Sequence, residues 1–411
     1  MKRRLSILSL VLAFVMCLGV AMPAWAEEKN NLTSDVIDIM NAVEFEEMQV
    51  KSMEQVAEND GVQKFTVDIA DATLDVYADN VKVSQQMIEE YFNRASYAIA
   101  QETVATLNSD REISDDVIQY IYTDGINEVR YIEGFDDNNE HVRDMIITKA
   151  EQPDQANAGI VLQASDTIPS GIGIRGKVKQ DGQYITGSFV DCKPENYDSR
   201  FSCYQYFGFM TTVGSTNANY ANADMGVVYS DVRGGWRPYL LLTQGAGSAK
   251  KTYMISTESN QSDVIAVGHK VWELGESGYK TNAPVYITVY KNISKYDGSS
   301  GTAVRLSVRG TSAADGRTNV LCLAEAGTGV NISVNYRVLT TITDYDNGLK
   351  GDQNVHIEVP AASNASAPRL KMNYSGLNVA GTAVTWTGTE PDSSKVTSAT
   401  TGTIVGQVNN K

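Results

Sequence analysis

The sequence predicts a protein with two parts, an acidic α+β domain at residues 27–157 followed by an all-β sandwich domain at residues 158–360. Residues 27–157 carry 30 Asp and Glu against 9 Lys and Arg, whereas residues 158–411 carry 20 against 22. The first part has a helical period and few glycines or prolines, and the second has short apolar runs of period two between turn residues. Such a step in charge and pattern is typical of two domains with different roles.

Residues 1–26 are typical of a secretory signal peptide. Basic residues at positions 2–4 precede an apolar run at residues 5–20, and the small-x-small pattern Ala24-Trp25-Ala26 marks a cleavage site. We therefore expect a protein that is secreted or held at the cell surface, with no membrane span after cleavage.

Export would place the cysteines in an oxidising compartment, where disulfides persist. Cys192 and Cys203 bracket a polar segment rich in turn residues, so we predict a bridge that closes this loop and stabilises the fold by about 3 kcal/mol. Cys322 lies in an apolar run and is expected to be a buried free thiol. The residues alone leave open that all three are reduced and packed.

In the acidic part, Ser84 can cap a helix whose apolar residues between positions 87 and 99 follow a 3.6 period. Val36, Met40 and Val43 predict an earlier helix, with a slip in the period before Val50, Met53 and Ala57. Apolar and polar residues alternate over residues 65–69 and 74–78, which predicts a β-hairpin.

The acidic residues of this part are scattered along its helices and strands, which favours a solvated surface that keeps the chain soluble. Attraction of cations or of a basic partner is the alternative, and a removable pro-region, cut within residues 150–158, is another. The excess of negative charge disfavours nucleic acid as a partner, because phosphate binding needs the opposite sign.

In the neutral part, apolar residues alternate with polar ones over residues 285–289, 304–308 and 330–334, and turn clusters separate these runs. Many half-buried strands, each with one apolar face, predict two sheets that cover each other in a lectin-like or jelly-roll-like sandwich. Residues 361–411 are expected to be a linker and a β-rich tail, and the sequence leaves open whether that tail belongs to the sandwich.

One stretch of the neutral part resembles a known family. Ala223-Asp-Met-Gly-Val-Val-Tyr229 is followed by Trp236-Arg-Pro-Tyr239, and this cadence resembles secreted bacterial proteins of the YrpD-like type. The resemblance covers residues 159–360 and excludes the acidic part. It implies a β-sandwich in an extracellular setting and an activity that is not established, so it assigns no catalytic residue.

No strong catalytic or metal-binding motif stands out. Glu273 and Glu276 are the nearest pair of carboxylates for glycoside hydrolysis, with Trp272 and Tyr279 as neighbouring sugar platforms, but Gly275 and Gly278 favour a solvated loop there. Calcium is the one cofactor to consider, because Asp344, Asp346 and Asp352 place carboxylates around a turn. An ordinary hairpin turn explains the same residues, so no cofactor is expected.

The aromatic residues carry the remaining functional signal. Flat rings with a polar edge stack on sugar rings, and polar side chains beside them read hydroxyl groups. The candidate ligand-binding residues are Tyr206, Asp224, Trp236, Arg237 and Tyr239. The competing interpretation places the same rings in the core of the sandwich.

The function predicted from these observations is that of a non-catalytic extracellular binding protein for a polysaccharide or another cell-surface component. A glycan-active enzyme of sandwich fold is one alternative. A structural or adhesive surface protein with an acidic partner-binding domain is the other. The sequence does not indicate an oligomeric state.

Overall fold

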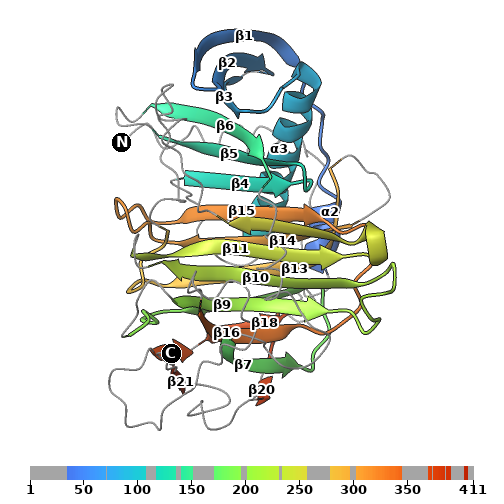
Figure 1. Ribbon diagram of the computed structural model, residues 1–411, viewed down its shortest axis with the longest axis vertical. Helices are drawn as coiled ribbons and strands as arrows, with labels where there is room; N and C mark the ends of the chain where they lie inside the picture. Colours follow the sequence, from blue (N-terminus) through green and yellow to red (C-terminus); the bar gives the residue numbers. More distant parts are fainter. Residues whose placement is uncertain are drawn as a thin grey trace, which may run out of the picture.

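The computed structural model describes most of the chain between residues 35 and 405. The described ranges are 35–70, 72–107, 117–135, 140–150, 171–195, 201–230, 234–256, 278–296, 302–344, 369–372, 374–384, 386–389 and 402–405. These residues are mostly β-structure, arranged in two large sheets with helices on one side (Figure 1). The predicted signal peptide lies outside them.

The larger sheet has twelve strands in the order β1-β2-β3-β6-β5-β4-β15-β14-β13-β8-β18-β19. Its first half comes from the acidic part: β1 (Val50–Asn59), β2 (Val62–Ile69), β3 (Ala72–Asp79), β4 (Val117–Thr123), β5 (Asn127–Phe135) and β6 (His141–Lys149). Its second half comes from the neutral part: β8 (Tyr184–Phe189), β13 (Val285–Ser294), β14 (Thr302–Gly310), β15 (Val320–Gly327), β18 (Ser375–Val379) and β19 (Thr382–Ala383).

The smaller sheet has seven strands in the order β12-β11-β10-β9-β16-β7-β20. Its strands are β7 (Gly171–Val178), β9 (Phe201–Met210), β10 (Ala221–Ser230), β11 (Gly235–Gln244), β12 (Lys251–Ser256), β16 (Arg337–Asp344) and β20 (Trp386–Thr389), with the short helix η2 (Gly247–Ala249) before β12. A separate ribbon pairs β17 (Arg369–Met372) with β21 (Gly402–Val405). Because β18 and β19 join the larger sheet and β20 joins the smaller one, part of the tail belongs to the sandwich.

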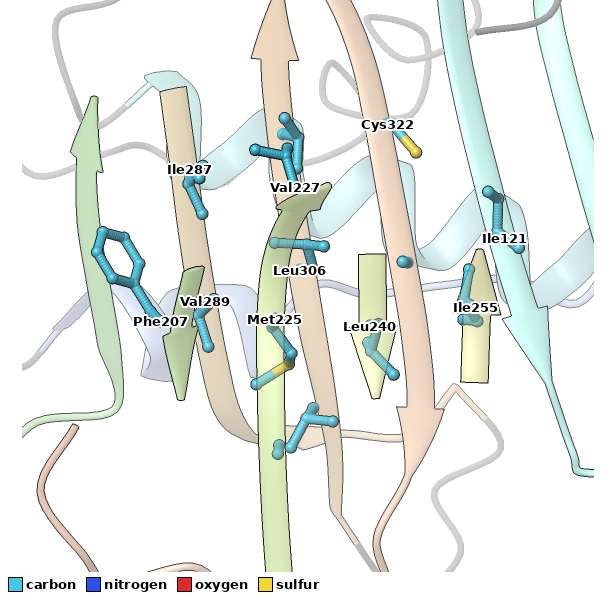
Figure 2. Packing of buried hydrophobic residues seen from close by; sticks show 14 of the residues in the cluster. Ile121, Phe207, Met225, Val227, Leu240, Ile255, Ile287, Val289, Leu306 and Cys322 are labelled. Carbon is cyan, nitrogen blue, oxygen red and sulfur yellow. The ribbon is translucent and has the colours of Figure 1, made fainter. Parts of the chain in front are cut away.

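The two sheets pack face to face around one apolar core. Alternate residues of each strand point inward, so Met225, Val227 and Leu240 of the smaller sheet meet Val289 and Leu306 of the larger sheet (Figure 2). These side chains are all fully buried. The predicted sandwich of two mutually covering sheets is therefore present.

The acidic part joins the sandwich through one pair of strands. Strand β4 runs parallel to β15, in register from Val117 opposite Val320 to Tyr122 opposite Glu325. The described strands of the acidic part thus extend the larger sheet and form no sheet of their own (Figure 1). The charge step near residue 157 separates two stretches of sequence that share one sheet.

Two helices from the acidic part cover the outer face of the larger sheet. Helix α3 (Gln85–Leu107) confirms the predicted periodic helix, and the Ser84 hydroxyl accepts a hydrogen bond from the Met87 amide at 3.3 Å, as a cap should. Helix α2 (Asp35–Asn41) confirms the start of the earlier helix. Its expected continuation at Val50 and Met53 is wrong, because these residues lie in strand β1. No helix in the described parts of the chain has the length and apolar character for a membrane crossing.

A buried ion pair lies beneath α3. The Arg305 guanidinium of β14 donates to Glu325 Oε2 of β15 at 2.6 Å and to Gln101 Oε1 of α3 at 2.8 Å. Next to it, the Ser307 hydroxyl donates to Glu102 Oε1 of the helix at 2.7 Å. The Arg305 side chain is 1 % exposed, so its charge is stable there only while these partners surround it.

The hairpin predicted over residues 65–78 is confirmed as β2 and β3, which turn at Ala70. The predicted strand at residues 330–334 is wrong, although its alternation resembles a strand. The side-chain amide of Asn292 forms two hydrogen bonds with the backbone of Ile332. Its Oδ1 accepts from the Ile332 N–H and its Nδ2 donates to the Ile332 carbonyl, both at 2.8 Å. A side chain thus satisfies the backbone groups that a neighbouring strand would otherwise bind.

The predicted disulfide between Cys192 and Cys203 is also wrong. Both are free, buried thiols, as is Cys322. Cys203 points from β9 into the core, where burial raises the pKa of its thiol, and the Cys192 Sγ donates to the Val190 carbonyl at 3.3 Å. The polar segment between them suggested a loop closed by a bridge, but both side chains instead serve as small core residues.

Replacement of Arg305 by Met should lower the free energy of unfolding by about 3–5 kcal/mol, because it leaves Glu325 as a buried charge without its guanidinium. Denaturant unfolding measures this change. Arg309→Met on the same strand, where the side chain is partly exposed, is the control and should cost less than about 1 kcal/mol. Addition of Glu325→Leu to Arg305→Met should recover part of the loss, and a further loss would contradict the account.

Candidate functional site

The sequence-predicted ligand residues do not all lie together. Trp236 is fully buried in the core, where its ring packs edge-on against Phe189 at 5.4 Å and Tyr229 at 5.5 Å between centroids. Side chains alternate between the two faces of a strand, so Trp236 and Tyr239 of β11 point to opposite sides of the sheet. Trp236 is therefore a core residue, and a role in ligand contact is excluded by its burial.

The other four candidates share the outer face of the smaller sheet. On β10, Gly226 pairs in register with Tyr206 of β9 on one side and with Tyr239 of β11 on the other. Both tyrosines are half-buried. A Cβ atom at position 226 would lie 2.6 Å from the Tyr206 Cβ, so glycine is needed there and leaves a low point between the two rings.

Tyr204 joins these two rings into one aromatic group. Its ring centroid lies 6.1 Å from that of Tyr206 and 5.4 Å from that of Tyr239, both edge-to-face. The hydroxyl of Tyr206 bonds the Thr341 hydroxyl of the neighbouring strand at 3.1 Å, which fixes the ring against the sheet. Tyr204 is 7 % exposed and so supports the two more exposed rings.

Charged side chains flank the tyrosines. Gly208 of β9 pairs in register with Asp224 on one side and with Arg337 of β16 on the other, and both charged residues are half-buried. Arg237, on the same face, is 2 % exposed. A Cβ atom at residue 278 would lie 2.9 Å from the Arg237 Cγ, so this backbone segment packs on the arginine.

We call this surface the outer-face patch, and its residues are Tyr204, Tyr206, Asp224, Arg237, Tyr239 and Arg337. Tyr204 and Arg337 are not among the ligand-binding residues predicted from the sequence. The alternation Tyr204-Gln205-Tyr206 could have indicated Tyr204, because residues two apart on a strand share a face. No sequence signal points to Arg337, since β16 reaches β9 only through the sheet topology.

The comparison with protein families finds a match over more than half of the chain. The model of the YrpD domain, described as a domain of unknown function, matches residues 165–405. The chain belongs to the YrpD family. The predicted YrpD-like resemblance is thus confirmed, and the match extends past residue 360 into the tail. No curated protein matches the chain.

The YrpD domain contains the whole outer-face patch and every described strand of the smaller sheet. Strands β1 to β6 and helices α2 and α3 lie outside the match. In this chain the outer-face patch therefore lies within the residues that match the family, and the acidic part lies outside them.

The predicted catalytic and calcium candidates lie almost entirely outside the described residues. Glu273, Glu276, Asp346 and Asp352 lie outside the described residues, and of Asp344 only its place as the last residue of β16 is described. Tyr279, expected beside the glutamates as a sugar platform, is instead buried, and its hydroxyl donates to the Val308 carbonyl at 2.9 Å. Within the described ranges, no group of three or more His, Cys, Asp or Glu could hold a metal ion.

A second polar cluster lies on β5 and β6, away from the outer-face patch. The Glu133 carboxylate is 2.9 Å from His141 Nε2 and 3.2 Å from an Arg143 nitrogen, and it accepts a hydrogen bond from the Tyr131 hydroxyl at 3.0 Å. Burial alone would raise the pKa of Glu133, but these three neighbours outweigh it, so that the pKa is lowered. The cluster contains one carboxylate, and its hydroxyl group, that of Tyr131, donates to this carboxylate, which favours a structural role.

Replacement of Glu133 by Gln should lower the free energy of unfolding by about 1–3 kcal/mol at neutral pH, because Arg143 and His141 lose a charged acceptor. The pKa of this carboxyl is lowered from 4.5 in the fold, so its contribution is present above that pH and is lost as the pH falls through the native pKa. Denaturant unfolding of Glu133→Gln and of the unmodified protein at a series of pH values measures this loss. The two free energies of unfolding should converge as the pH falls.

The matched control is Glu54→Gln on the exposed strand β1, which should change the free energy of unfolding by less than about 0.5 kcal/mol at any pH. A loss in Glu133→Gln that stays constant into the acid range would contradict the assigned charge interaction.

Proposed function

We propose that this protein is an exported, non-catalytic binding protein whose sandwich, used in the manner of a lectin, holds an extracellular polysaccharide or another cell-surface polymer on the outer-face patch. The observation that carries the proposal is the pair Tyr206 and Tyr239, which stand on either side of Gly226 on one face of the sheet. Sugar rings present flat apolar faces and polar edges, and tyrosine matches both.

The spacing of the two rings favours a polymer over a single sugar. They lie on strands that are two apart, and adjacent strands are separated by about 4.8 Å, so the platforms are about 10 Å apart at their backbones. One sugar ring does not reach across that span, whereas linked rings do. Asp224 and Arg337 beside the platforms supply an acceptor and donors for hydroxyl groups.

Glycan hydrolysis is less well supported at this patch. That chemistry requires two carboxyl groups about 5–9 Å apart, and Asp224 is the one carboxylate among the patch residues. Binding needs only shape, stacking and hydrogen bonds, all of which the patch offers. The basis for export is the amino-terminal signal pattern, and the excess of acidic residues in the first part is consistent with a solvated extracellular surface.

Replacement of Tyr206 or Tyr239 by Ala should weaken binding of the full chain to its glycan by about tenfold or more, equivalent to about 1.4 kcal/mol. A glycan array identifies the ligand, and titration of each variant against that glycan measures the change. Trp236→Ala is unsuitable for this test, because removal of a fully buried Trp costs about 3–5 kcal/mol of stability.

Tyr286→Ala is the matched control, since this tyrosine is 39 % exposed and lies on β13 of the other sheet. It should bind as the unmodified chain does. Unchanged binding in both patch variants, or an equal loss in Tyr286→Ala, would overturn the proposed site.

A further inference from the structure

We propose that residues 35–150 are a permanently bound partner of the YrpD domain, so that a cut between the two parts leaves both pieces in one complex. This inference concerns the fate of the acidic part and is independent of the proposed ligand. It excludes a pro-region that leaves once the connection is cut.

The first support is the edge that the acidic part covers. Strand β15 bonds β14 on one side and β4 on the other. Without β4, the polar backbone of β15 would become an open edge, which is a template for aggregation. Leu321 and Leu323 of β15, now buried against the core that α3 covers, would also lose their cover.

The second support is the charge that the acidic part buries. Glu325 binds Arg305 from within the YrpD domain, but Gln101 and the Ala98 carbonyl come from α3 at 2.8 and 3.4 Å. Departure of the helix would remove two acceptors of a buried guanidinium. It would also leave Ser307 without the Glu102 carboxylate that it now binds. Water would replace these partners after departure, so each bond contributes a modest net stabilisation of the complex, and the bonds to the charged guanidinium contribute the most.

The third support is that contacts between the two parts extend to both sides of Arg305 and Ser307. Asn41, at the end of α2, accepts a hydrogen bond from the Ser294 amide of β13 at 3.0 Å. Arg317, which precedes β15, donates to the Phe135 carbonyl of β5 at 3.2 Å. Ile37 and Met40 pack with Tyr290 and Ile293 in a separate apolar cluster. The contact surface therefore runs across β13, β14 and β15 rather than being limited to one point.

The connecting residues 151–170 lie outside the described structure, and none of these contacts depends on them. Buried hydrogen bonds and apolar contacts, which join the two parts, respond little to salt, in contrast to an attraction between exposed charges. The predicted complex should accordingly survive high salt even though the acidic part carries most of the net negative charge.

The test inserts a site-specific protease recognition sequence after Asn157 in the full chain. The purified protein is cut, cutting is followed by denaturing electrophoresis, and the cut fraction is analysed by size-exclusion chromatography at micromolar concentration. The two pieces should elute together in low salt and in about 1 M NaCl, where the Debye length is about 3 Å. Separate elution of the pieces, or precipitation on cutting while the uncut protein stays soluble, would overturn the proposal.

Two variants test whether the bonds made by Gln101 and Ser307 hold the cut pieces together. In the cut protein, Gln101→Ala combined with Ser307→Ala should raise the fraction of free acidic piece on dilution, because both changes remove bonds between the parts. Glu90→Gln, an exposed position on the same helix, should not raise it. Equal release from the two variants would contradict the role assigned to Gln101 and Ser307.

Discussion

The parallel pairing of β4 with β15 is the constraint on which the rest of the structure depends. This pairing joins strands of the acidic part and of the neutral part in one twelve-stranded sheet, and it places α3 over the centre of that sheet. Arg305 can be buried only because α3 and β15 both supply acceptors to it. The sheet, the helix and the ion pair therefore support one another, and the sheet and the set of Arg305 acceptors are complete only when both parts are present.

The outer-face patch depends on the packing of the two sheets, because it lies on the face of the smaller sheet that points away from their shared core. Core side chains such as Met225 and Val227 hold β10 against the larger sheet, and this fixes which alternate residues face outward. Gly226 and Gly208 then leave room between the strands for Tyr206, Tyr239 and Asp224 to lie across the sheet. A rigid sheet holds the two rings in place without a ligand, so little ordering entropy is lost when a polymer binds.

Local patterns predicted the local elements well. The 3.6 period after Ser84 and the alternation around Phe65 depend on neighbours within one element, and both were correct. The 330–334 run failed because Asn292, far along the chain, satisfies its backbone. The site was predicted in part: Tyr206, Asp224, Arg237 and Tyr239 share a face, but strand alternation already placed Trp236 on the opposite face from Tyr239. The β4–β15 pairing and the place of Arg337 depend on long-range topology, which a single sequence does not show.

We infer that the acidic part and the YrpD domain unfold as one cooperative unit. Native-state hydrogen exchange on the backbone amides of β4 and β15 tests it most directly, because exchange reports the free energy of opening at each residue. The account predicts that both strands open together, with free energies close to that of global unfolding. Exchange of the β4 amides at a much lower free energy, while β15 stays protected, would contradict it.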